Sequence, residues 1–389
     1  MKKTWTKFAV VAMSFMMVFA LAACGGGSSD SGDAGSTALK LGNTGPLTGP
    51  AAIYGNAVKN GGQLAVDEIN AAAGSEVLAW QAEDDEADGE KAVNAYNKLM
   101  DDGMQVFVGS TTSGSAVAAT EKAFEDRVFT LTPSASQVAV TEGKDNVFQL
   151  CFSDPNQGVA AAKYIVDNMP DAKVGVIYNN DSDYSSGIYA KFKEEYEKSG
   201  KKLVAEEASA EANTDYQAQV NSMKNAGADL VFLPTYYTPA SNVLIQADKV
   251  DYTPTFFGVD GMDGILTLEG FDTKLAEGVM LLTPFIASAE DEATQKFVKA
   301  YKDAYGEEPN QFAADAYDCV YAVYNAFQET GLDASAANDE ICDALVKAFT
   351  GGFKYSGLTG ADMQWNEAGE VNKTPNAMVI KNGVYEPVK

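Results

Sequence analysis

Histidine is absent from the 389 residues, and several kinds of enzyme site are excluded with it. The chain can form no Ser-His or Cys-His nucleophile pair, has no imidazole general base and lacks the commonest zinc ligand. Basic residues are also scarce, since Lys and Arg total 28 against 55 Asp and Glu, for a net charge of -27. Nucleic-acid binding needs a basic surface that displaces counterions, so the composition argues against a DNA- or RNA-binding protein.

Cysteine is rare too: the chain has four, none in C-x-x-C spacing, which excludes a disulfide scaffold and a zinc ribbon. Cys151 is predicted to be a buried thiol. Cys319 and Cys342 fall on successive predicted helices, where they are either disulfide partners in an exported protein or two buried thiols. Apolar residues make up 46% of the chain, enough for a large core, and the length predicts two or three domains.

The N-terminus carries the features of an export signal. Residues 1–23 combine three lysines with an apolar run that is shorter than the about 20 residues of a membrane span. The run ends in Leu21-Ala22-Ala23-Cys24, which resembles a bacterial lipobox. The resemblance implies cleavage before Cys24, lipidation of its thiol and an extracytoplasmic, membrane-anchored protein; an uncleaved anchor and an ordinary signal peptide are the alternatives. Residues 24–37 are rich in Gly and Ser and predict a flexible tether.

The remaining chain alternates strands and helices, which predicts an α/β protein with two doubly wound parallel sheets. The first series of strands is predicted at 38–44, 77–82, 105–109 and 128–131, and the second at 173–178, 202–208, 229–234 and 254–259. Helices at 291–305, 312–330 and 337–349 are too many for the second sheet alone, so the chain is expected to return to the first lobe. Short strands are expected near 361–364 and 376–381.

Polar and aromatic residues follow the predicted strands, at the edge where open parallel sheets bind ligands. Hydroxyl-rich loops lie at 110–115 and 132–136, and tyrosines and one acid follow the later strands. Each loop alone is also explained by ordinary helix caps and turns. Together they predict a site for a small zwitterion with an apolar side chain. No nucleophile, metal cluster or phosphate loop accompanies them, so we expect a binding protein without a cofactor rather than an enzyme.

The order of these stretches resembles the type I periplasmic binding proteins of ABC importers, in the leucine-isoleucine-valine binding family. The matching segments include LKLGNTGPLTGPAAIYG, VFVGSTTSGSA, TLTPSAS, NNDSDYSSG, FFGVDGM and YSGLTGADMQWNEAGEV, and they span residues 39–389. The resemblance implies two lobes joined by a hinge that the chain crosses several times. Lobe 1 is expected to comprise 38–152 and 284–356, and lobe 2 to comprise 153–283 and 357–389.

The resemblance also implies a ligand site. Ser113 is expected to bind the ligand carboxylate, Ser134 and Ser136 the same ligand head, and Asp260 the α-ammonium. Tyr184 and Tyr236 are expected to close over the ligand from lobe 2, and Tyr54 and Phe312 to form apolar walls in lobe 1. The branched-chain binders commonly have Glu where this chain has Asp260, and Asp263 is a competing acid in the same loop. They typically carry a disulfide where this chain has Ala87 and Thr112.

The implied function is capture of a small amino acid, in the first place a branched-chain one, for an ABC permease and its ATPase by a monomeric protein that closes around the ligand. A sensory or receptor protein of the same fold is the alternative, and so is an importer subunit for another small carboxylate or amide. The choice among amino acids is left open by the sequence.

Overall fold

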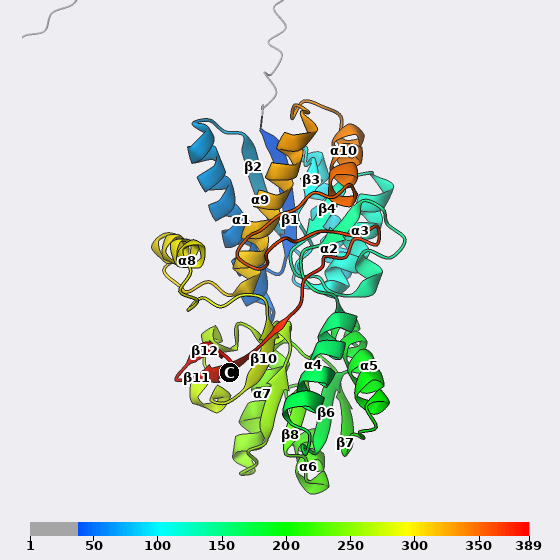
Figure 1. The fold of residues 1–389 in the computed structure, drawn as a ribbon, viewed down its shortest axis with the longest axis vertical. Coiled ribbons are helices and arrows are strands. Elements are labelled where there is room, and N and C mark those ends of the chain that lie inside the picture. The colour runs from blue at the N-terminus through cyan, green and yellow to red at the C-terminus, as the bar shows by residue number, and fades with distance from the viewer. Residues whose placement is uncertain (1–37, 389) are drawn as a thin grey trace, which may run out of the picture. The chain divides into compact units, whose positions relative to one another are not determined.

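The computed structural model describes residues 38–388, so the predicted signal peptide, Cys24 and the tether lie outside the described residues. Within this range no helix is both long enough and apolar enough to cross a membrane. Two α/β lobes are present, each built on a mostly parallel sheet (Figure 1). The chain passes between the two sheets three times, which confirms the predicted fold class.

The first lobe contains a five-stranded parallel sheet in the order β2-β1-β3-β4-β5. Its strands are β1 (Leu39–Gly45), β2 (Leu78–Asp84), β3 (Val106–Phe107), β4 (Phe129–Thr132) and β5 (Val147–Gln149). Side chains alternate between the two faces of a strand. Val106 and Val108 therefore pack under α1 (Ala52–Ala73) and α9 (Gln311–Thr330), whereas Phe107 packs under α2 (Gly89–Asp101) and α3 (Ser113–Glu125). Helix α10 (Asn338–Thr350) contacts α9 and β4.

Helices α1 and α9 approach each other closely. A Cβ atom on Gly61 of α1 would lie only 2.0 Å from the carbonyl oxygen of Ala313 on α9. Only glycine permits this approach, because any side chain would collide with the backbone of the opposite helix. The contact fixes the N-terminal end of α9, which carries several residues of the candidate site.

The second lobe contains a seven-stranded sheet in the order β12-β11-β10-β9-β8-β6-β7. Its parallel strands are β6 (Val174–Asn179), β7 (Ala205–Ser209), β8 (Leu230–Leu233), β9 (Thr255–Gly258) and β10 (Met280–Thr283), and the antiparallel strands are β11 (Asn376–Lys381) and β12 (Val384–Pro387). Helices α4 (Asp154–Asn168) and α5 (Asp183–Lys198) cover one face, and α6 (Gln217–Ala226) and α7 (Tyr237–Lys249) cover the other. Helix α8 (Glu292–Tyr305) returns to the first lobe and contacts α1.

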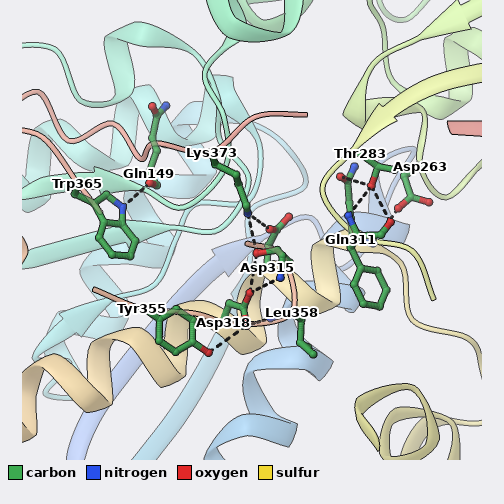
Figure 2. A network of polar contacts seen from close by, with 12 residues as sticks. Gln149, Asp263, Thr283, Gln311, Asp315, Asp318, Tyr355, Leu358, Trp365 and Lys373 are labelled. Atoms are coloured by element: carbon green, nitrogen blue, oxygen red, sulfur yellow. Dashed lines mark hydrogen bonds and ion pairs between the residues drawn. The ribbon is translucent and has the colours of Figure 1, made fainter. Parts of the chain in front are cut away.

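The third passage between the lobes occurs late in the chain. The strand predicted at 361–364 forms only isolated bridges, Tyr355 with Met363 and Trp365 with Val371. Trp365 packs in the first-lobe core and donates a hydrogen bond from Nε1 to the Gln149 carbonyl (2.8 Å; Figure 2). These contacts place Trp365 against the first lobe, and the predicted division of the chain between the lobes stays a prediction.

A buried ion pair holds this last crossing segment against α9 (Figure 2). Lys373 Nζ lies 3.0 Å from Asp315 Oδ1, and both side chains are 3% exposed. The ammonium also donates to the Thr359 hydroxyl at 2.7 Å. Asp318, one turn further along α9, accepts from the Thr359 and Leu358 amides. Burial raises the pKa of Asp315 to about 6, although the Lys373 ammonium lowers it.

The three cysteines within the described range are free and buried, which leaves Cys319 and Cys342 as two thiols rather than a disulfide. Both lie in the core between the first sheet, α9 and α10. Burial raises the pKa of the Cys319 thiol well above its usual value, and Cys151 is among the neighbouring groups that contribute.

We expect Lys373→Met to lower the free energy of unfolding by about 3–5 kcal/mol, because it leaves two buried carboxyls beside no cation. Chemical denaturation of the ligand-free protein measures this change. Lys202→Met, at an exposed lysine, is the matched control and should change the stability by less than about 0.5 kcal/mol. If Lys373→Met lowers the free energy of unfolding by less than about 1 kcal/mol, the carboxyls of Asp315 and Asp318 are neutral without the lysine.

Candidate functional site

Residues from both lobes line one small cavity where the strands end. Its volume is about 10 Å³, which is about the space of one water molecule. The lining side chains come from the loops after β3, β4, β8 and β9 and from the starts of α1, α5 and α9. They are Tyr54, Thr111, Thr112, Ser134 and Phe312 in the first lobe and Tyr184, Tyr236, Asp260 and Gly261 in the second. Six of the eight predicted ligand-binding residues are thus brought together. Because the cavity is so small, the lobes must separate before a larger molecule can enter.

Four aromatic rings form the apolar wall of the cavity. The Tyr54 ring centroid lies 4.3 Å from that of Phe312 and 5.3 Å from that of Tyr236. Tyr236 stacks on Tyr184, with 4.7 Å between their centroids. Aromatic contacts at these separations are favourable beyond their buried area. The wall is therefore continuous across the two lobes, and a ligand side chain would have to insert between rings from opposite sides.

Tyr54 also makes polar contacts that the sequence analysis missed. Its hydroxyl donates to the carbonyl of Gly261 in the second lobe and accepts from the Tyr237 amide at 3.2 Å. The Ile53 amide donates to the Tyr237 hydroxyl at 3.3 Å. Thr238 donates from its hydroxyl to the Pro50 carbonyl at 2.9 Å. Residues 50–54 thus fasten the first lobe to the start of α7 in the closed form.

Asp260 is the acidic group of the cavity and is 4% exposed. Its carboxyl accepts from the Tyr184 hydroxyl, while its amide donates to Gln157 Oε1 at 3.2 Å. Burial raises the pKa of Asp260 to about 7, and the hydrogen bonds from Tyr184 and Gln157 offset part of this rise. An ionised Asp260 in the closed site therefore carries a penalty on the order of 4 kcal/mol, at about 1.4 kcal/mol for each unit of pKa. A ligand cation beside it would relieve this penalty.

Asp263, the competing acid, binds backbone amides and does not face the cavity. It is 4% exposed and accepts from the Gln311 amide at 2.9 Å and from the Gly264 amide at 2.8 Å. Its carboxylate therefore caps the start of α9, and it does not line the cavity. Gln311 in turn donates from Nε2 to the Asp260 carbonyl at 2.6 Å, so the two acids are joined through one residue.

The predicted serines are only partly at the cavity. Ser134 lines it and donates its hydroxyl to the Thr111 carbonyl at 2.6 Å. Ser113 and Ser136 are buried just outside the lining. Thr112 and Ser136 have hydroxyl oxygens without a hydrogen-bond partner among residues 38–388. Thr112 was not predicted to bind ligand, although its place in the hydroxyl-rich loop 110–115 is the signal that could have identified it.

A second acid, Asp154, was missed by the sequence analysis. It is the first residue of α4 and is 2% exposed. Both carboxyl oxygens lack a hydrogen-bond partner in the part of the chain that the structure describes. Burial raises the pKa of Asp154 well above its usual value, the Ser136 hydroxyl offsets part of this rise, and the charge of Asp260 adds to it. An acid before a predicted helix ordinarily indicates a helix start, which is why the pattern carried no sign of a site.

No group of three or more Cys, Asp or Glu side chains in residues 38–388 is arranged to hold a metal ion. The polar groups at the cavity are hydroxyls, backbone amides and carboxyls. Such groups bind a small molecule that carries both a negative and a positive charge, because the hydroxyls and amides donate and the carboxyls accept.

Comparisons with known proteins agree with this geometry. The sequence profile of the periplasmic binding protein family matches residues 38–383. The Leu/Ile/Val-binding protein BraC3 of Rhizobium johnstonii is 29% identical over 75% of this chain and 80% of its own length. A binding protein of Pseudomonas aeruginosa named for leucine, isoleucine, valine, threonine and alanine is 28% identical over 79% of this chain and 82% of its own length.

Solved structures are similar as well. The branched-chain amino acid transporter substrate-binding protein LivJ of Streptococcus pneumoniae, in complex with isoleucine, matches with a TM-score of 0.80 and 31% identity over 90% of this chain and 98% of its own. A solute-binding protein of R. palustris in complex with benzoate has a TM-score of 0.79 and 20% identity over 90% of this chain and 95% of its own, which shows the fold alone.

We expect pH to control how far the ligand-free protein closes. In the closed form burial raises the pKa of Asp260 to about 7, and in an open form water would return it toward about 3.9. Closing therefore takes up a proton. Below about pH 4 the Asp260 carboxyl is already protonated and does not oppose closure, and as the pH rises to about 7 the ionised carboxylate opposes closure increasingly. Small-angle X-ray scattering should show a larger radius of gyration for the ligand-free protein at about pH 7.5 than at about pH 5.

The Asp260→Asn variant is the control for this effect. Its side chain has no proton to take up, so its radius should vary less with pH than that of the parent. Equal pH dependence in the parent and the variant would assign the effect to other groups.

Proposed function

This chain belongs to the periplasmic binding protein family, and from that premise we propose that it is the substrate-binding component of an ABC importer that captures a branched-chain amino acid between its lobes. The observation that carries the proposal is that the two lobes bring different polar groups to the cavity: the first lobe supplies the free hydroxyl of Thr112, and the second supplies the buried carboxyl of Asp260. The family consists of solute-binding proteins that act outside the cytoplasm.

In the proposed mechanism the open first lobe binds the ligand carboxylate through the loop hydroxyl of Thr112 and the amides at the start of α3. Charge-assisted hydrogen bonds of this kind contribute roughly 1.5–3 kcal/mol each. The ammonium then reaches Asp260 on the second lobe. Because only the closed form engages both ends of the ligand, binding shifts the population toward closure. Opening at the permease would release the ligand.

The aromatic wall supports an aliphatic ligand side chain, and the relatives' names support leucine, isoleucine and valine. The Pseudomonas aeruginosa relative is also named for threonine and alanine, so smaller side chains belong to the range to be tested. The runner-up functions are import of another small carboxylate or amide and a sensory role of the same fold. Delivery to a permease and its ATPase, action as a monomer and anchoring through Cys24 are further parts of the proposal.

A thermal-shift screen of the 20 amino acids tests the ligand. A ligand at about 100 times its Kd should stabilise the protein by roughly 2.7 kcal/mol, and we expect the largest shifts with L-leucine, L-isoleucine and L-valine. Asp260→Asn should lower their affinity by more than tenfold, since removing one partner of a buried charged pair costs about 2–5 kcal/mol. Asp248→Asn, at an exposed acid of α7, should leave the affinity unchanged. Binding of benzoate but of no amino acid would contradict the proposal.

A separate measurement tests the anchor. Cys24 follows Leu21-Ala22-Ala23, so Cys24→Ala should remove the lipidation site and move the protein from the membrane fraction to the soluble fraction, or leave an unprocessed precursor. Cys151→Ala, which changes a buried body cysteine, should not alter the fractionation. Membrane association that survives Cys24→Ala would show that the lipobox does not act.

A further inference from the structure

Helices α1 and α7 begin at the contact between the two lobes, and neither has a capping side chain of its own. The residue before α1 is Ala51, which has no side-chain acceptor. The residue before α7 is Tyr236, whose side chain makes no capping hydrogen bond. The first amides of a helix have no acceptor within the helix, so away from water they need an acceptor from elsewhere in the structure.

Each of these helices receives an acceptor from the other lobe. The Ile53 amide in the first turn of α1 donates to the Tyr237 hydroxyl at 3.3 Å, and the Tyr237 amide at the start of α7 donates to the Tyr54 hydroxyl at 3.2 Å. We call these two hydrogen bonds the reciprocal cap. Beside them the Thr238 hydroxyl donates to the Pro50 carbonyl at 2.9 Å. Because the N-terminal end of a helix carries partial positive charge, the hydroxyl oxygens make the approach of two such ends favourable.

The reciprocal cap is tightly packed and lies beside the ligand cavity. Tyr237 is buried, and its ring centroid lies 4.8 Å from that of Tyr54. A Cβ atom on Gly264 would lie only 2.9 Å from Ile53 Cγ2, so the backbone of the second lobe approaches α1 directly. Tyr54 lines the cavity, whereas Tyr237 and Thr238 do not. These last two residues can therefore affect ligand binding through lobe closure without touching the ligand.

We propose that Tyr237 is a positioning residue that sets how strongly the closed form is favoured, and that Thr238 assists it. When the lobes separate, water replaces the hydroxyls as the acceptor, so the reciprocal cap favours closure only by the modest net value of its hydrogen bonds. The cap forms in the closed protein whatever the ligand is, so it raises the affinity for every ligand by the same factor. Selectivity is left to the cavity. This inference rests on the proposed function only for the choice of ligands in its tests.

Calorimetry with L-leucine and L-valine provides the first test. Tyr237→Phe keeps the ring and removes the hydroxyl, which leaves the Ile53 amide without its acceptor in the closed form. We expect the affinity for both ligands to fall by the same factor, about fivefold to thirtyfold. Tyr252→Phe is the matched control, because the Tyr252 hydroxyl donates to the Ala228 carbonyl at 2.7 Å within the second lobe. This control should bind both ligands like the parent.

Stopped-flow kinetics provides a second test. The ligand enters the open form, in which the reciprocal cap is absent, so Tyr237→Phe should leave the association rate of L-leucine within about twofold of the parent. The dissociation rate should rise by the whole factor lost in affinity. Thr238→Val, at a half-buried residue, removes only the hydrogen bond to Pro50 and should show the same pattern with a smaller effect. This variant keeps the test available if Tyr237→Phe does not fold.

The outcomes separate this inference from the proposed function. If Tyr237→Phe and Thr238→Val bind as tightly as the parent, the proposal is overturned. It is also overturned if the loss differs more than about threefold between L-leucine and L-valine, because Tyr237 would then act on the ligand side chain.

A parent that binds no amino acid would refute the proposed function, and small-angle X-ray scattering of the ligand-free proteins then tests the reciprocal cap alone. At about pH 5, where the Asp260 carboxyl opposes closure less, Tyr237→Phe should have a larger radius of gyration than the parent and Tyr252→Phe. Equal radii for the three proteins would contradict the proposal.

Discussion

The closed site buries carboxyl groups with no ion-pair partner in the described chain, and this electrostatic constraint shapes the rest of the structure. Burial raises the pKa of both Asp154 and Asp260. A closed form without a cation must therefore hold protons or bear the penalty of buried charge. An ammonium relieves the same penalty, so ligand capture and lobe closure are coupled by charge rather than by shape alone. The absence of histidine and the shortage of lysine and arginine fit a site that receives its positive charge from the ligand.

The second constraint is mechanical, because two lobes that separate must keep their own structures. Each lobe has a sheet covered on both faces, so each retains a core of its own when the cavity opens. The contacts across the lobes include hydrogen bonds from residues 50–54 to α7, aromatic contacts at the cavity, and an apolar cluster that joins α1 and the start of α9 to the second lobe. The buried pair of Lys373 and Asp315 also holds the last crossing segment against α9.

The sequence predicted the long elements well because their patterns are strong. The helices that became α1 and α9 and the early strands show clear periodicity, and their ends located the polar loops. The strands β5, β10 and β12 were missed because none of them follows an α-helix in the alternation from which the other strands were predicted: β5 and β10 come after short turns, and β12 comes directly after β11. The strand expected at 361–364 is instead a pair of isolated bridges, since this segment packs on the first lobe through Trp365 and does not join a sheet.

The candidate site was predicted less completely, for physical reasons that differ between residues. The aromatic residues and Asp260 could be found because they follow strands, and strand ends converge at one edge of a parallel sheet. Whether Ser113 or Thr112 faces the cavity depends on the orientation of one turn, which no pattern of residue types specifies. Asp154 is the first residue of α4, where an acid ordinarily caps the helix, so its residue type gave no sign that its oxygens would lack partners. The binding roles of the other residues stay predictions.

Helix α9 carries one ring of the aromatic wall, Phe312, and one member of the buried ion pair, Asp315. Phe312 and Asp315 are less than one turn apart, and Gln311 before them contacts Asp260 and the end of β10. The helix is also held against α1 at Gly61, where no side chain fits. A change at the wall that widens the range of accepted ligands would therefore shift the hinge pair as well. Ligand selectivity and the rate of ligand release are therefore expected to change together in variants of this chain. A variant that accepts more ligands would also open at a different rate.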